Sequence, residues 1–252
     1  MNPLDRASVE RAGYATGWEN VRESTSENVF LFSARHKAEV VIRKLDDPKG
    51  AFLVCFHSGP SPVELNRSFA QRADGAYEVS GELELRNILW RAAQLSMSLP
   101  TQAADVYATK VADIEIAGFS GTEALRIVKQ RIGQDLYREA LMNYWGGACA
   151  VTGLAISELL RASHAKPWAK CDSDAERLDV FNGFLLAANL DALFDSGLIS
   201  FDDQGSIMYS KKLQKRDLIL FGMDQSKENK LRWLSSKHLM YLAWHRERVF
   251  QK

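Results

Sequence analysis

The chain has 252 residues, of which 46% are hydrophobic and 25% are charged. This balance is typical of a soluble globular protein and excludes a disordered or membrane-embedded chain. The formal net charge of +0 argues against a protein that coats nucleic acid through bulk electrostatics. The length allows one large domain or two smaller ones, and we favour two.

The N-terminal segment MNPLDRASVERAGY is polar, whereas a secretory signal needs an apolar run of about 7–15 residues. No later run approaches the roughly 18 apolar residues of a membrane span. We therefore expect a cytoplasmic protein. Its three cysteines, Cys55, Cys149 and Cys171, are widely spaced and form no CxxC pair. Their pattern predicts reduced thiols rather than a disulfide framework or a cysteine zinc knuckle.

Residues 1–121 predict an N-terminal domain of mixed α and β structure. EVVIRKL and AFLVCF flank the turn-rich DDPKG, which predicts a β-hairpin, and no clean hydrophobic period precedes it. Helical spacing of apolar residues over 81–98 predicts a helix that ends before Pro100. DVYATKVADIEIAGF, over residues 105–119, favours a strand, and the Ser-Gly pair behind it predicts a domain boundary near Gly121.

The second predicted domain begins at residue 122 and extends to residue 252. It opens with a helix over 122–143, for which Thr122 is the candidate N-cap. A second helix is predicted over 235–250. His238 and His245 lie seven residues apart on this helix. Because no acidic or cysteine partner is nearby, we favour ordinary surface or core-edge histidines over metal ligands.

Charge is distributed unevenly in the second domain. Residues 172–203 hold eight acidic residues and a single basic one, whereas residues 205–252 hold eleven basic and four acidic residues. An acidic pocket beside a basic flank suits a metal-using enzyme that acts on a polyanion. Two solvated faces of opposite sign explain the charges equally well.

The segment from Cys149 to Gly205 carries the chemically informative residues. An apolar stretch precedes His164 in ISELLRASHAKPW, and Pro167 ends the regular secondary structure three residues after this histidine. The alternating pattern of FNGFLLAA predicts a short strand, and NLDALFD can form two helical turns that end at Gly197. The predicted order is strand, loop, strand and helix, with His164 at the edge of an element where it can face solvent.

Two carboxylates lie on the helix of this segment. Asn189 is its candidate N-cap, and Asp191 and Asp195, four residues apart, share one face. Their repulsion needs a cation or a solvent shell to offset it, and a hard divalent ion such as Mg²⁺ would fit. The alternative, which the residues alone favour, is that Asp191 interacts with the helix N-terminus and Asp195 is a surface residue.

The motifs CAVTG, ASHAKPW, NGFLL and LFDSGLISF follow one another within residues 137–205. Asn182 lies eighteen residues after His164, and Asp191 lies nine beyond Asn182. In the order and spacing of these motifs the segment resembles the HNH endonuclease family. The resemblance implies a ββα-metal fold, so we expect an α+β protein with an N-terminal mixed α/β domain and a C-terminal HNH nuclease domain.

The resemblance also implies a role for each motif residue. His164 would be the general base that deprotonates the attacking water. Asn182 would hold the loop between the strands by hydrogen bonds to the backbone and so orient His164. Asp191, at the position of the second histidine that names the family, would bind the metal, which would stabilise the phosphorane charge and the leaving 3′ oxygen.

Two positions depart from the pattern of the family. Ser163, a weak ligand, stands where many relatives have a metal-binding aspartate before the catalytic histidine. An aspartate at position 191, where histidine is common, shifts the expected metal from Zn²⁺ or Ni²⁺ to Mg²⁺ or Mn²⁺. Asp195 either completes the ligand set or makes a structural hydrogen bond, and the two readings are equally supported.

Arg138, Arg161 and Lys166 lie near the motifs and are candidates to bind substrate phosphates. For any one of them a solvated surface residue is the favoured alternative before the resemblance is counted. Trp168 could stack on a base, although an aromatic residue after proline more often serves packing. His57 in the N-terminal hairpin has no partner visible in the sequence and is read as structural.

The leading hypothesis is a DNA endonuclease of a restriction or antiphage-defence type. Its N-terminal domain would select the target or regulate the nuclease by binding a DNA feature, a nucleotide signal or a partner protein. A homodimer would supply the second site that cutting both strands needs. The alternative is a nucleic-acid-binding regulator that has kept the HNH fold but lost catalysis, and the weak ligand Ser163 favours this alternative. A third hypothesis is a nuclease that acts on RNA rather than DNA.

Overall fold

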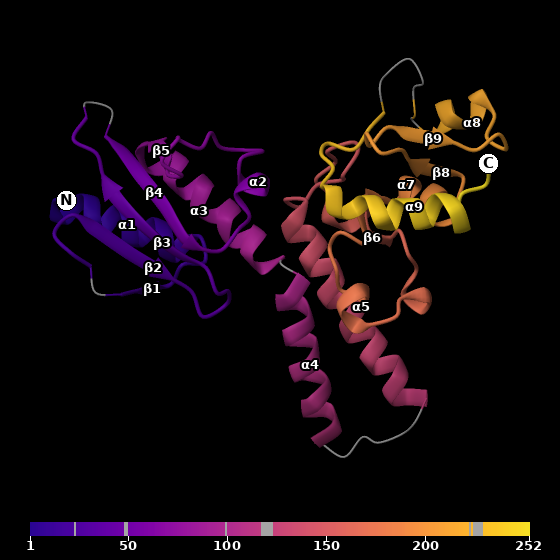
Figure 1. Ribbon diagram of the computed structural model, residues 1–252, viewed down its shortest axis with the longest axis horizontal. Coiled ribbons are helices and arrows are strands. Elements are labelled where there is room, and N and C mark those ends of the chain that lie inside the picture. Colours follow the sequence, from indigo (N-terminus) through magenta and orange to yellow (C-terminus); the bar gives the residue numbers. More distant parts are fainter. Residues whose placement is uncertain (23, 48–49, 99, 117–122, 222, 224–228) are drawn as a thin grey trace. The chain divides into compact units, whose positions relative to one another are not determined.

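The computed structural model describes residues 1–252 except 23, 48–49, 99, 117–122, 222 and 224–228 (Figure 1). Its contacts divide the chain into two compact units, Met1–Leu99 and Pro100–Lys252. The predicted boundary near Gly121 and the candidate N-cap Thr122 lie outside the described residues. Among the helices that are described, none combines the length and the apolar character that a membrane span requires.

The first unit contains an antiparallel sheet in the order β1-β2-β3-β4-β5. The hairpin predicted around DDPKG is confirmed, since β3 pairs with β4. Alternate residues of β2 and β3 are buried, as expected for a sheet with one covered face. The strands are β1 (Asn20–Val21), β2 (Asn28–Phe32), β3 (Glu39–Lys44), β4 (Ala51–Ser58) and β5 (Tyr77–Ser80).

Two long helices cover this sheet. α1 (Pro3–Ala15) and α3 (Gly81–Met97) pack against each other, and both contact strands (Figure 1). α3 confirms the predicted helix. α1 was not predicted, although its start carries a local signal: the Asn2 side chain accepts a hydrogen bond from the Asp5 N–H. The short helix α2 (Pro62–Leu65) precedes β5.

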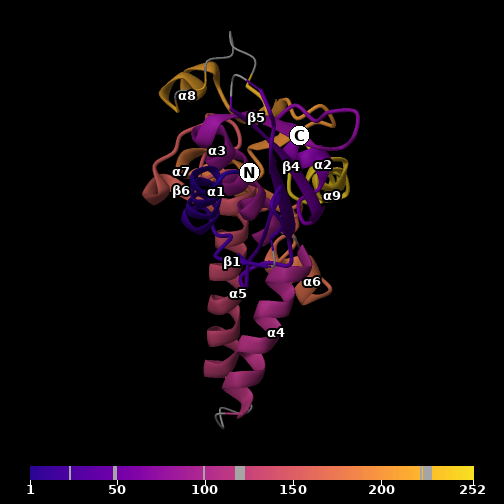
Figure 2. The ribbon, with the colours of Figure 1, turned by 90° about the vertical axis from the view of Figure 1, so that its left-hand side faces the viewer.

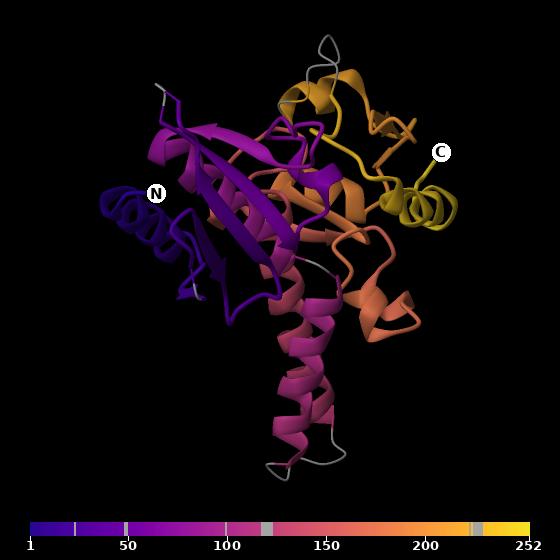
Figure 3. The same cartoon turned by 60° about the vertical axis from the view of Figure 1, so that its left-hand side comes forward.

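The second unit begins with two long helices, α4 (Pro100–Ile116) and α5 (Glu123–Tyr144), which run side by side (Figures 2 and 3). α5 confirms the predicted helix. The strand predicted over 105–119 is wrong, because the part of it that the structure describes lies in α4. Ala103 and Tyr107, four residues apart, are buried. Packing along α5 therefore outweighs the strand preference of the β-branched residues in this segment.

The segment with the motifs forms the predicted ββα arrangement. β6 (Leu160–His164) pairs in antiparallel register with β7 (Gly183–Ala187), and α7 (Ala188–Asp195) contacts both strands. The protein is thus α+β, with the ββα element in its C-terminal part. The remaining elements of the unit are η1 (Ser157–Leu159), η2 (Trp168–Lys170), α6 (Asp174–Arg177), β8 (Ile199–Phe201), β9 (Ile207–Tyr209), α8 (Lys215–Leu220), η3 (Ser236–His238) and α9 (Leu239–Arg248).

Two local predictions in this unit need correction. The N-cap of α7 is Ala187, whose backbone is extended, whereas Asn189 lies in the first turn and donates from Nδ2 to the Phe221 carbonyl. The terminal helix is present as η3 and α9. His238 and His245 are buried on it, with 0% and 1% of their surface exposed, so they lie deeper than the surface or core-edge positions that were expected.

Candidate functional site

His164 is the last residue of β6 and lies opposite Gly183 of β7. Its Nε2 lies 2.9 Å from the Arg177 carbonyl oxygen, and its ring stacks on Tyr137 at 3.8 Å between centroids. Because a carbonyl oxygen can only accept, Nε2 carries the proton of the neutral ring. Nδ1 is then the basic nitrogen, and no hydrogen bond to the described residues occupies it.

The environment of His164 keeps its imidazole neutral. Burial lowers the pKa of His164 to about 4, although the bond to the Arg177 carbonyl favours the charged form. The close approach of the two strands depends on Gly183, since a Cβ there would overlap the Ser163 carbonyl oxygen and the Tyr137 hydroxyl. A neutral imidazole with one free nitrogen is the form that can accept a proton.

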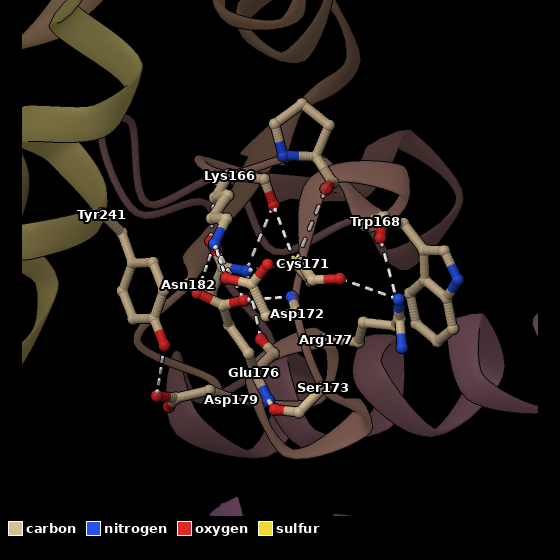
Figure 4. Close-up of polar contacts among 11 residues, drawn as sticks. Lys166, Trp168, Cys171, Asp172, Ser173, Glu176, Arg177, Asp179, Asn182 and Tyr241 are labelled. Carbon is tan, nitrogen blue, oxygen red and sulfur yellow. Dashed lines mark hydrogen bonds and ion pairs between the residues drawn. The ribbon is translucent and has the colours of Figure 1, made fainter. Parts of the chain in front are cut away.

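Asn182 immediately precedes β7, is 0% exposed and holds both ends of the loop that connects the two strands (Figure 4). Its Oδ1 accepts from the Lys166 N–H at 2.8 Å. Its Nδ2 lies 3.1 Å from the carbonyl oxygens of both Lys166 and Glu176, and 3.3 Å from Cys171 Sγ. The same loop contains Arg177, whose carbonyl contacts the ring of His164.

Lys166 is committed to the loop rather than free to bind phosphate. Its Nζ lies 2.8 Å from Asp172 and 2.9 Å from Glu176, and only 12% of its side chain is exposed (Figure 4). These two carboxylates raise the pKa of Lys166 above its usual range. A substrate phosphate would have to displace both partners, so the geometry gives little support to the predicted role.

The two candidate arginines differ in how many of their guanidinium N–H groups remain available to bind a phosphate. Arg138 donates to the carbonyl oxygens of Leu160 at 2.7 Å and Ser157 at 2.8 Å, so both of its Nη groups serve the backbone. Arg161 uses Nη1 on the carbonyls of Glu158 and Leu160, both at 2.9 Å. Within the described part of the chain its Nη2 makes no hydrogen bond, and the residue is exposed. Arg161 is therefore the best placed of the three predicted phosphate ligands.

Ser163 brings the two aspartates of α7 together. Its hydroxyl is buried and donates to Asp195 Oδ1 at 3.1 Å, and it also lowers the pKa of the Asp191 carboxyl. Burial raises the pKa values of both carboxyls and outweighs the effects of Ser163 and of the nearby Arg161 charge on Asp191, and Asp191 raises the pKa of Asp195 further. Among the described residues no salt bridge reaches either carboxylate. The pair on α7 therefore forms an acidic site that is linked to β6 through Ser163, the residue before His164.

A pocket of about 350 Å³ opens beside His164 and Asp195. Ala162, Pro167 and Trp168 contribute to its wall from the segment around β6. Gln134 of α5, His245 of α9 and Val249, which follows α9, contribute from parts of the chain that are distant in sequence. Sequence reasoning missed Gln134, for which no local signal exists. The sequence assigned no role to His245, although it correctly predicted that this residue lies on the terminal helix.

His245 links α9 to the end of α7. Its Nδ1 lies 3.0 Å from Ser200 Oγ, its Nε2 lies 3.1 Å from the Phe194 carbonyl oxygen, and its ring stacks on Phe194 at 3.9 Å. Phe194 directly precedes Asp195 in α7. The contacts of His245 therefore fix the last turn of the helix that carries the two aspartates.

The burial of His245 predicts a pH dependence of folding stability. Burial lowers its pKa from 6.5 to about 4, so its contribution is complete above pH 6.5 and is lost as the pH falls from 6.5 towards 4. His245→Gln should therefore be less stable than wild type at pH 7.5, and this deficit should shrink by about 2 kcal/mol at pH 5. Urea denaturation at the two pH values measures this difference. The exposed His57→Gln is the control, and an equal deficit at both pH values would contradict the prediction.

The comparison with protein families agrees with this geometry. Residues 149–202 match the model of the family described as HNH endonuclease, and the match includes β6, the loop, β7 and α7. No curated protein matches the chain. Nucleases of this family act on nucleic acid and generally depend on a divalent metal. The C-terminal part of this chain therefore contains a domain of the HNH endonuclease family.

Proposed function

We propose that the protein is a divalent-metal-dependent DNA endonuclease that hydrolyses phosphodiester bonds, with His164 as the general base. The observation that carries the proposal is the setting of His164 within the family-matched segment. Its Nε2 is bound to the Arg177 carbonyl, its Nδ1 is free of the described residues, and it lines a pocket together with Asp195.

In this proposal His164 Nδ1 accepts a proton from the attacking water while Nε2 keeps its own. The Arg177 carbonyl then favours the imidazolium that forms, which offsets part of the cost of charging a buried ring. Tyr137 stacks on one face of the ring and so supports its orientation. Asn182 acts as a positioning residue, because it holds the loop that presents the Arg177 carbonyl.

The residues proposed to hold the metal are Asp191, Asp195 and Ser163. The described residues include no group of three or more His, Cys, Asp or Glu suited to a metal ion, so water and substrate oxygens would complete the shell. The two carboxylates fit a hard ion such as Mg²⁺ or Mn²⁺, because they are oxygen donors whose repulsion is offset by no salt bridge from the residues that the structure describes. When bound, such an ion stabilises the charge that develops on the phosphate and on the leaving 3′ oxygen.

The biological role we propose is restriction or antiphage defence in the cytoplasm. Arg161, whose Nη2 makes no hydrogen bond to the described residues, would bind a phosphate of the DNA. Arg138 and Lys166 would support the site through their bonds to the backbone and the loop. The first unit would select the target or regulate cutting by binding DNA, a nucleotide signal or a partner protein. A homodimer would cut both strands.

The test is incubation of supercoiled plasmid DNA, unmodified, methylated and phage-modified, with Mg²⁺, Mn²⁺ or EDTA. Cleavage with a divalent metal and none in EDTA is the expected result. Nicked product would indicate one active site acting alone, and linear product would indicate a dimer. DNA binding without cleavage of any substrate would instead support the inactive regulator.

Asp191→Asn and Asp195→Asn test the metal assignment. Each should lower the rate at limiting Mg²⁺ by at least about 100-fold, since losing an oxygen ligand should cost no less than losing a supporting residue. Titration calorimetry with MnCl₂ alone should show weaker binding for both variants. Asp203→Asn, at an exposed residue that pairs with Arg246, is the matched control. Unchanged Mn²⁺ affinity in both α7 variants would overturn the assignment.

A further inference from the structure

Part of the pocket beside His164 has no role in the proposed hydrolysis. Beyond His164 and Asp195, its wall includes Gln134 of α5, Trp168 of η2 and Val249 at the end of α9. Its volume of about 350 Å³ lies at the lower end of the range of about 300–1,000 Å³ that is common for small-ligand sites. The space is therefore suited to a small group that lies next to the reacting phosphate.

Trp168 is held in place before any ligand arrives. A Cβ at Gly133 of α5 would overlap its indole, so the ring fits closely against that glycine. The guanidinium of Arg177 lies 5.8 Å from the centre of the indole, and the ring of His164 lies edge-on at 6.0 Å. The side chain is nevertheless only half-buried. A fixed and partly accessible aromatic ring can stack on a ligand with little loss of conformational entropy.

Gln134 offers hydrogen bonds at the same pocket. Its side chain is exposed, and its amide makes no hydrogen bond with the described residues. A carboxamide presents an NH₂ donor group beside a carbonyl acceptor, which matches the paired donor and acceptor on the edge of a nucleobase. Aromatic stacking and an edge contact are together the chemistry by which proteins bind a single base.

We infer that this pocket binds one unpaired nucleobase beside the scissile phosphate, with Trp168 stacking on the base and Gln134 contacting its edge. A base inside a duplex is stacked on both sides and paired, so it reaches such a pocket only after it leaves the helix. This inference rests on the proposed nuclease function and deepens it. It identifies the substrate class as DNA with an unpaired or extruded nucleotide at the cut.

The first experiment compares cleavage of a fully paired duplex with that of the same duplex carrying one unpaired nucleotide. Wild type should cleave the second about tenfold faster, and Trp168→Leu should reduce this ratio to near one. Gln134→Ala should keep the ratio but change which unpaired base is preferred, whereas Gln130→Ala, one turn earlier on α5, should change neither. Equal cleavage of both duplexes by wild type would overturn the inference.

The second experiment measures base binding without cleavage. DNA with 2-aminopurine at the unpaired position is titrated with His164→Ala in Mg²⁺, and stacking on the indole should quench its emission. The double variant His164→Ala with Trp168→Leu should show no quenching. The double variant His164→Ala with Trp168→Phe should show part of it, which distinguishes loss of stacking from misfolding. Quenching without cleavage by wild type would refute the proposed function alone. Cleavage with no Trp168-dependent quenching would refute the inference alone.

Discussion

His164→Ala is expected to lower kcat for DNA cleavage by roughly 1,000-fold, within the range of about 10²–10⁴-fold that a positioned general base contributes. The loss should occur in kcat rather than in KM, because the ring acts on water and not on substrate binding. Single-turnover cleavage of a labelled oligonucleotide with saturating Mg²⁺ measures the effect. The physical basis of the prediction is a neutral ring whose Nδ1 has no hydrogen bond to the described part of the chain.

Two controls distinguish loss of the base from loss of structure. His57→Ala changes an exposed histidine of the first unit and should cleave at the wild-type rate. Added imidazole should restore part of the activity of His164→Ala, because the truncation leaves space beside a pocket of about 350 Å³. A variant that cleaves within a few-fold of wild type would contradict the assignment of His164.

Asn182→Ala should have the largest effect on stability, lowering the free energy of unfolding of the second unit by about 3 kcal/mol. It leaves the buried N–H of Lys166 and the carbonyl of Glu176 without their partner, and each buried group left unsatisfied costs about 1–3 kcal/mol. Urea denaturation measures the loss. Limited proteolysis should cut the loop over residues 165–182 faster than in wild type.

Asn189→Ala is the matched control for this change. Asn189 is an exposed asparagine whose side chain makes one hydrogen bond within the described residues, to the Phe221 carbonyl, so its loss should cost about 1 kcal/mol or less. Asn182→Asp should be at least as damaging as Asn182→Ala, because a carboxylate oxygen would replace the Nδ2 donor opposite two carbonyls. If Asn182→Ala unfolds like wild type, the ion pairs of Lys166 suffice to hold the loop.

The sequence by itself determined the elements that depend on local signals. The turn residues DDPKG predicted the β3–β4 hairpin, and apolar spacing predicted α3 and α5. Pro167 and Gly197 delimit the strand, loop, strand and helix order, so the ββα element around His164 was predictable. These features depend on residues close together in the chain, which pattern and turn chemistry describe well.

Only the tertiary structure decided features whose partners are distant in sequence. α4 is a helix because it packs along α5, despite its β-branched residues. Lys166 is bound by two loop carboxylates, and Arg138 by backbone carbonyls, so charge alone did not reveal which cation is free. His245 of α9 and Gln134 of α5 both line the pocket, and no local sequence pattern indicates that residues so distant in the chain share one pocket. Burial and hydrogen-bond partners are properties of the packed unit, and they decide whether a polar side chain supports the fold or faces a substrate.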